Sequence, residues 1–214
     1  KRKFKNMNNQ KTILFVTPIL NNFVLNDLGI LTSEYKVIQN TYDWNRKYLT
    51  PLFLIHQFFF IAINIARINK IIIEFGGYWS LIPSLFGNLF DKKTIIICHG
   101  TDCASIPSLK YGSLGKKYIN FFCKISYRLA DLICPVSESL IKVENNFHIN
   151  IKERKQGILN FFPSLNTPFK VIYNGLEIEF WKDNKYKKRK NTFVSVLSEK
   201  QYFLKGAVLI CDLA

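Results

Sequence analysis

Short apolar runs alternate with longer, helix-like segments along most of this chain. Most of the runs are rich in isoleucine, valine and threonine, and each has the length of a buried strand. Strands are predicted at Lys11–Thr17, Tyr35–Thr41, Lys70–Phe75, Lys93–Cys98, Asp131–Val136 and Phe169–Tyr173. Strands that alternate with helices are typical of βαβ units and of a mostly parallel sheet. The pattern therefore predicts an α/β fold in which helices cover both faces of that sheet.

The segments between these strands predict helices. They are Lys47–Asn69, Trp79–Phe90 with Pro83 in its first turn, Ser113–Ala130, and residues 137–145 with Ser137 as the N-cap. Residues 49–66 contain no charged side chain, and the stretch is long enough to raise the question of a membrane span. His56 and Asn64 would be costly at mid-depth in lipid. A helix buried against the sheet is therefore favoured over a membrane-inserted one.

Charge and cysteine content narrow the classes of protein. The formal net charge is +15, and the five cysteines include no C-x-x-C pair, which is typical of a reducing cytosol rather than of a disulfide framework or a zinc site. The three histidines show no ligand spacing, so no metal site is expected. Residues 110–128 are basic and aromatic and contain no acid. Such a stretch suits anionic lipid head groups or nucleic-acid phosphates, and it equally suits a basic outer face over an aromatic core face.

The loops after three strands carry the candidate chemistry. They are Gly76-Gly77, His99-Gly100-Thr101-Asp102 and Ser137-Glu138. In a doubly wound sheet, ligands bind outside the carboxyl ends of the strands. Glycines that admit a close ligand, an imidazole that titrates near neutrality and small hydroxyls suit such a crevice. The loops therefore predict an enzyme that handles a nucleotide or a sugar.

Each of these residues also has a structural interpretation. A lone histidine such as His99 is often a satisfied structural residue, and Gly76-Gly77 could form a positive-φ turn before a helix whose N-terminus faces the crevice. Asp102 is interpreted first as a cap or an Asx turn, although it could orient His99 or contact acceptor hydroxyls. Ser137 is interpreted first as a helix cap.

The chain divides into four predicted parts. Residues 1–10 form a basic tail, 11–181 an α/β domain, 182–191 a basic linker, and 192–214 the first strand (192–197) and helix (205–214) of a second α/β domain. Asn174-Gly175 is a strong turn dipeptide near the end of the first domain. A domain cannot be completed in so few residues, so the chain is expected to be part of a longer protein.

Several spaced motifs resemble those of family 4 glycosyltransferases. They are RLADLICPVSESL at 128–140, VIYNGL at 171–176 with Trp181, LKGAVLICDLA at 204–214, HGTD at 99–102, and the strand–Gly–Gly–helix at 71–85. The resemblance runs from about residue 70 to the end. It implies the GT-B fold, in which two Rossmann-like domains face each other across a cleft. It also implies a retaining, metal-independent transfer of sugar from a nucleotide-sugar donor to a surface polysaccharide or lipid-linked acceptor, with no other cofactor.

The resemblance also implies roles for single residues. His99 corresponds to the histidine near the transferred sugar, and Lys205 lies close to the lysine that contacts the donor diphosphate. The residues implied to line the cleft or the domain crossover are Gly76, Gly77, Ser137, Glu138 and Asn174, with Asp102 as a further candidate for acceptor binding. The location implied is the cytoplasm, with peripheral contact at the inner face of the plasma membrane through residues 110–128 as a hypothesis.

The chain also departs from the pattern. Residues 17–22 (TPILNN) replace the glycine pair expected after the first strand, and 195–199 (SVLSE) replace an expected arginine. No two glutamates lie eight positions apart, as the family's paired glutamates do, so the chain alone is expected to be inactive. A non-catalytic domain that binds a glycan or a partner therefore remains an alternative. A basic nucleic-acid-binding protein is less favoured, because no such motif is present.

Overall fold

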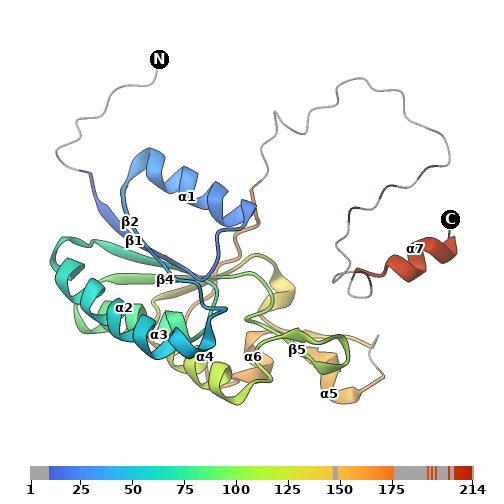
Figure 1. Cartoon of the computed structure of the whole chain (residues 1–214). Coiled ribbons are helices and arrows are strands. Elements are labelled where there is room, and N and C mark those ends of the chain that lie inside the picture. The colour runs from blue at the N-terminus through green and yellow to red at the C-terminus, as the bar shows by residue number, and fades with distance from the viewer. Residues whose placement is uncertain are drawn as a thin grey trace.

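A five-stranded, all-parallel sheet forms the centre of the molecule (Figure 1). The computed structural model describes residues 10–146, 149–175, 192, 194, 196, 202 and 205–213. The strands lie in the order β2-β1-β3-β4-β7. They are β1 (Thr12–Thr17), β2 (Lys36–Thr41), β3 (Lys70–Glu74), β4 (Lys93–Cys98) and β7 (Leu132–Pro135). Each lies within a predicted strand.

Helices cover both faces of this sheet. Helix α1 (Asn22–Glu34) lies on one face, and α2 (Thr50–Asn64), α3 (Tyr78–Leu89) and α4 (Lys117–Leu129) lie side by side on the other (Figure 1). The predicted α/β class is confirmed, and the arrangement is compatible with a Rossmann-like fold. The chain runs from β1 outward to β2 and then returns past β1 to β3. The carboxyl ends of β1 and β3 therefore flank the topological switch point, where folds of this kind bind ligands.

Apolar layers on both faces hold the sheet between the helices. Strand β1 is buried along its whole length, as expected for a strand that helices cover on both sides. On the α1 side the core consists of Ile13, Phe15, Val24 and Ile72. The larger layer under α2, α3 and α4 includes Ile61, Ile73, Phe86, Ile96 and Tyr127.

Helix α2 packs on the sheet through an unusually polar face. Its buried side chains are Gln57, Ile61 and Asn64. Pro83 lies inside α3 rather than in its first turn, and it has no N–H to donate to the carbonyl of Trp79 one turn earlier. The Gln57 amide donates to that carbonyl at 3.2 Å and to Asn40 Oδ1 at 2.8 Å. Gln57 therefore replaces the missing helical hydrogen bond. The helix predicted as buried against the sheet is in contact with the domain through this one side only, since 22% of its most apolar stretch is buried.

Replacing Gln57 with leucine is expected to lower the free energy of unfolding by about 1–3 kcal/mol, because the buried Asn40 Oδ1 and the Trp79 carbonyl both lose a hydrogen-bond donor. Urea denaturation of Q57L measures the change. The matched control is Gln39→Leu, at an exposed glutamine in β2, which is expected to stay within about 0.5 kcal/mol of the wild type. Equal stability of Q57L and the wild type would contradict this role.

The remaining elements are short. They are η2 (Lys47–Leu49), η3 (Ile65–Arg67), β5 (Ser105–Ile106), η4 (Pro107–Leu109), β6 (Tyr111–Gly112), η5 (Glu138–Leu140), β8 (Val143–Glu144), α5 (Ile151–Arg154), β9 (Lys155–Gln156), α6 (Ile158–Phe161) and α7 (Ala207–Leu213). The helix predicted over 137–145 is wrong. After one turn in η5 the backbone pairs elsewhere, since β8 pairs with β9 and Leu159 N donates to Ile141 O at 2.9 Å. Ser137 makes no side-chain capping hydrogen bond.

The segment predicted as a strand at 169–173 runs alongside β7. Lys170 N donates to Ile133 O and Ile172 N to Pro135 O, both at 3.0 Å, but only an isolated bridge forms. Predictions for the tail at 1–9 and for residues 176–191 lie outside the described residues. Of the strand predicted over 192–197, the structure describes only Thr192, Val194 and Val196, and none of these three belongs to a strand. Helix α7 lies within the last predicted helix.

Candidate functional site

The loops after β3 and β4 meet beside the switch point, and Asp102 joins them. Asp102 Oδ2 accepts a hydrogen bond from Gly76 N at 2.9 Å. Its Oδ1 accepts from His99 N at 3.1 Å and from Gly100 N at 3.0 Å. The side chain is buried, and both oxygens are used by the backbone. Asp102 therefore has a structural role, but it is neither the helix cap nor the Asx turn that the sequence favoured, because it accepts from residues that precede it; its carboxylate shapes the two loops.

The glycines after β3 are required by close packing. A Cβ on Gly76 would lie 2.1 Å from Tyr127 Oη, and a Cβ on Gly77 would lie 2.5 Å from the Trp79 ring. Neither glycine has a positive φ, and Gly77 is extended. At the end of β3 the residue with a positive φ is Phe75, at 61°. The interpretation of Gly76-Gly77 as a positive-φ turn is therefore wrong, and the absence of side chains there is what the fold uses.

A buried ion-pair geometry links β3 to the loop after β4. His99 Nε2 lies 2.6 Å from Glu74 Oε2, and only 4% of the His99 side chain and 0% of the Glu74 side chain are exposed. The rings of Phe23 and Phe75 lie 4.6 Å and 4.4 Å from the imidazole. Phe23 comes from the first turn of α1, so two segments distant in sequence, α1 and the end of β3, pack around His99. The pairing holds the imidazole in one orientation.

Two polar atoms of this pair have no partner within the described structure. His99 Nδ1 and Glu74 Oε1 are both buried and make no hydrogen bond. Buried polar atoms are rarely left in this state, and those that are left mark sites of strain or chemistry. Because Nε2 is engaged by Glu74, Nδ1 is the nitrogen that could hydrogen-bond a ligand. Nδ1 is buried, so a ligand could reach it only if a neighbouring side chain such as Phe23 moved.

The electrostatics of the site depend on two acids that the sequence did not single out. Burial raises the pKa of Glu74, and the hydrogen bond and charge of His99 oppose that rise. Burial also raises the pKa of Asp27 on α1, while the charge of His99 lowers it. Glu74 did have a sequence signal, since it is the only acid in the apolar strand β3 and lies at its carboxyl end. Asp27 had none.

The raised pKa of Glu74 predicts a pH dependence of stability. A carboxyl whose pKa is higher in the folded state favours folding in its protonated form, so stability falls as the pH rises from the ordinary value of 4.5 through the raised value. Glu74→Gln is expected to remove this part of the decline. Denaturation at several pH values across that window checks it, with Glu34→Gln at an exposed acid as control. Parallel profiles for E74Q and the wild type would exclude Glu74 as the source.

Of the other predicted site residues, Ser137 and Glu138 lie beside the His99 loop, whereas Asn174 and Lys205 are not joined to it. Val136 N donates to Cys98 O at 3.0 Å, so Ser137 and Glu138 follow β7 directly beside the His99 loop. Ser137 is half-buried, and Glu138 is exposed. Asn174 and Lys205 are both exposed, and in the described part of the chain no hydrogen bond joins either to these loops. The structure therefore brings six of the eight predicted residues to one sheet edge: His99, Gly76, Gly77, Asp102, Ser137 and Glu138.

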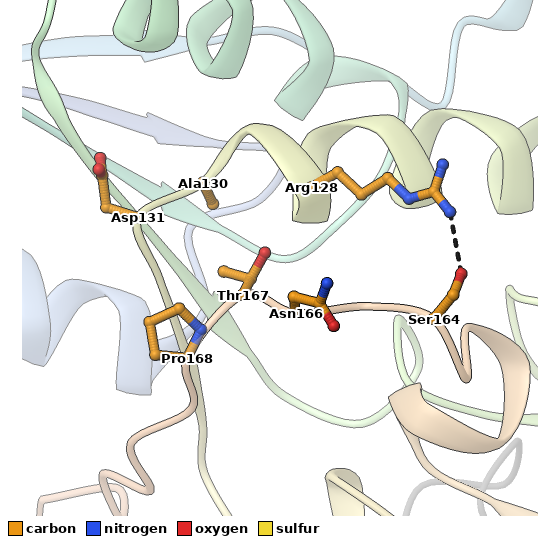
Figure 2. Close-up of a pocket in the computed structure, with 7 residues that line it drawn as sticks. All are labelled: Arg128, Ala130, Asp131, Ser164, Asn166, Thr167 and Pro168. Carbon is orange, nitrogen blue, oxygen red and sulfur yellow. Dashed lines mark hydrogen bonds between the residues drawn. The ribbon is translucent and has the colours of Figure 1, made fainter.

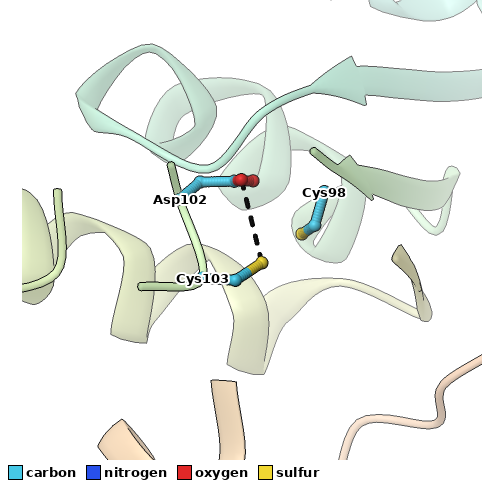
Figure 3. Close-up of side chains that lie close together, drawn as sticks. All are labelled: Cys98, Asp102 and Cys103. Carbon is cyan, nitrogen blue, oxygen red and sulfur yellow. Dashed lines mark hydrogen bonds between the residues drawn. The ribbon is translucent and has the colours of Figure 1, made fainter. Parts of the chain in front are cut away.

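Cys98, Asp102 and Cys103 form a cluster with three potential metal ligands (Figure 3). Their ligand atoms all lie within 4.8 Å of one another, and all three residues are buried. Burial raises the pKa of Cys103 to about 11 and that of Cys98 well above its ordinary value, which disfavours the thiolates that bind metals. Coordination would also compete with the backbone hydrogen bonds of Asp102. The chemistry of this group favours packing over metal binding.

A surface pocket of about 530 Å³ lies at the opposite edge of the sheet (Figure 2). It is lined by Arg128, Ala130, Asp131, Ser164, Asn166, Thr167 and Pro168, at the amino end of β7. Several polar groups there already make internal hydrogen bonds, including Arg128 to Ser164 Oγ at 3.0 Å and Thr167 Oγ1 to Tyr127 O at 2.6 Å. These hydrogen bonds join the end of α4 to the segment before Phe169.

No protein-family model matches this chain, and no curated protein matches it in sequence.

Proposed function

We propose that the chain is the acceptor-side domain of a family 4 glycosyltransferase that takes its sugar from a nucleotide-sugar donor. One observation carries the proposal: three loops singled out in the sequence converge at the carboxyl ends of β3, β4 and β7, next to the switch point between β1 and β3. This is where a doubly wound sheet binds small ligands. Family membership itself rests on the motif resemblance.

In this proposal Glu74 orients His99, and His99 Nδ1 hydrogen-bonds a sugar hydroxyl once Phe23 has moved. Gly76 and Gly77 lie at the edge where the acceptor binds and contribute through their backbone, since their missing side chains make room for Tyr127 and Trp79. Ser137 and Glu138 contact the acceptor from the neighbouring loop, and their half-buried and exposed positions support this. Asn174 and Lys205 act in the domain crossover and in donor phosphate binding. No metal or organic cofactor is invoked.

A non-catalytic glycan-binding domain is the second candidate. It is favoured by the burial of His99, whose Nε2 is already occupied by Glu74. Both candidates place the acceptor at the same loops. They differ in whether a sugar is transferred.

The test measures binding and transfer separately. Saturation-transfer NMR of the chain with glycan and lipid-linked acceptors reports binding, and mass spectrometry of mixtures with nucleotide sugars reports transfer. Transfer is assayed with the full product of the gene, whose reading frame past Ala214 is sequenced first. Acceptor binding with transfer supports the glycosyltransferase, and acceptor binding without transfer supports the binding domain. Absence of acceptor binding, or a salt-sensitive affinity for nucleic acid alone, would overturn both.

A further inference from the structure

Helix α2 exposes its most apolar side to solvent. The outward positions Leu52, Ile55, Phe59 and Ile63 follow one another at intervals of three or four residues and form a single stripe. Leu85 and Leu89 of α3 are exposed beside them, and 78% of Ile63 and 70% of Leu89 are accessible. We call these six residues the apolar face. Phe58 of α2 packs edge-on against Phe86 of α3 at 5.2 Å, which joins the two helices beneath it.

This orientation reverses the usual pattern of a surface helix, in which polar residues face water. The hydrogen bonds of Gln57 set this orientation, because its side chain must face inward to reach the Trp79 carbonyl and Asn40. Asn64 is buried on the same side. With Gln57 and Asn64 facing the domain, the apolar residues on the other side of α2 face solvent. Soluble monomers rarely leave a continuous apolar surface of this kind uncovered.

Charge around the apolar face is mostly positive; the exposed acids next to it are Asp43 before α2, paired with Arg46 at 3.0 Å, and Asp91 after α3. Helices α2, α3 and α4 contain no acidic residue, whereas α1 on the other face of the sheet contains Asp27 and Glu34. Lys47 and Arg67 flank α2 at its two ends, and both are exposed. The outer side of α4 adds further exposed cations and aromatic rings, namely Lys117, Tyr118, Phe121, Lys124 and Arg128.

We propose that the apolar face docks on an anionic lipid bilayer, with α2 lying in the plane of the membrane and the surrounding cations on the head groups. The continuous helical segment from Lys47 to Arg67 has the length and composition of a membrane span. It does not span here, because Gln57, Ile61 and Asn64 hold it against the sheet. A helix that is apolar on one side, with Lys and Arg at its margins, is the type that lies at the interface.

The charges select lipid over the other occupants. Two copies of the apolar face would bring mostly cationic margins together, because the three helices contain no acid and the nearby acids are Asp43, already paired with Arg46, and Asp91. An anionic bilayer complements both the apolar stripe and the cations. The inference does not depend on the proposed function, because it uses residues outside the candidate site.

Vesicle sedimentation tests the proposal with a matched pair of variants. Ile63→Glu places a charge on the apolar face, and Ile30→Glu does the same at an exposed isoleucine of α1, on the opposite side of the sheet, where 63% of the residue is accessible. Wild type is expected to bind phosphatidylcholine vesicles that contain phosphatidylglycerol, and to bind less well at high salt. I63E is expected to lower partitioning at least tenfold, and I30E to leave it unchanged. Circular dichroism confirms that each variant is folded.

Three results would overturn the proposal. They are failure of the wild type to bind anionic vesicles at low salt, an equal loss of binding in I63E and I30E, and a solution dimer that I63E dissociates while vesicles do not retain the wild type. Sedimentation velocity without lipid measures the last, and it would assign the face to a second copy of the chain. Loss of membrane binding would leave the acceptor-binding test of the proposed function unaffected, so the two can fail separately.

Discussion

Replacing Gly76 with alanine is expected to lower the free energy of unfolding by about 2–4 kcal/mol. The new Cβ would lie 2.1 Å from Tyr127 Oη, and Tyr127 is fully buried. Its hydroxyl donates to the Asp102 carbonyl at 2.9 Å, so the ring cannot withdraw without breaking that bond. Overpacking of a core costs about 1–3 kcal/mol, and loss of the hydrogen bond adds about 1 kcal/mol.

Chemical denaturation of G76A and of a matched glycine variant measures this effect. Gly29 lies inside α1, and a Cβ there would meet nothing within 4 Å. Gly29→Ala is therefore expected to stabilise the protein by up to about 1 kcal/mol, because alanine favours helix more than glycine does. The two glycine-to-alanine changes should have opposite signs. If G76A were as stable as the wild type, the contact between the β3 loop and Tyr127 would not be the constraint described here.

Replacing His99 with alanine is expected to have a comparable effect on stability and a large one on activity. The change removes the hydrogen-bond partner of Glu74 Oε2, whose companion oxygen already has none. An unsatisfied buried acceptor costs about 1–3 kcal/mol, and a buried charge without its partner costs about 3–5 kcal/mol. Glu74 is expected to take up a proton instead of keeping that charge, so a loss of about 2–3 kcal/mol is expected at neutral pH.

A second variant separates structure from chemistry at this position. The amide nitrogen of His99→Gln can still donate to Glu74, so H99Q should keep most of the stability. It lacks the imidazole Nδ1, and under the proposed function kcat/KM or acceptor affinity should fall about 10- to 100-fold, the equivalent of one good hydrogen bond. Stability is measured by denaturation and function by sugar transfer or acceptor binding. Unchanged function in H99Q would assign His99 only to holding Glu74.

Much of the sheet could be predicted from local pattern. Strands such as β1 and β4 are continuous apolar runs because helices cover both of their faces, and that demand leaves a clear trace in the sequence. The loops at Gly76 and His99 could also be placed together from the sequence, because the carboxyl ends of parallel strands lie at one edge of the sheet. The helix predicted after Ser137 failed because its backbone finds partners in β9 and near α6, and such long-range pairing has no local signal.

By itself, then, the sequence determined the α/β class, the positions of the central strands and the identity of the loops at their ends, because burial imposes a periodicity on neighbouring residues. Only the tertiary structure decided which side chains meet. His99 reaches Glu74 across 25 positions, and Phe23 of α1 packs against the imidazole. The apolar stripe of α2 faces outward for the same kind of reason, since the hydrogen bonds of Gln57 connect three elements that come together only in the folded protein.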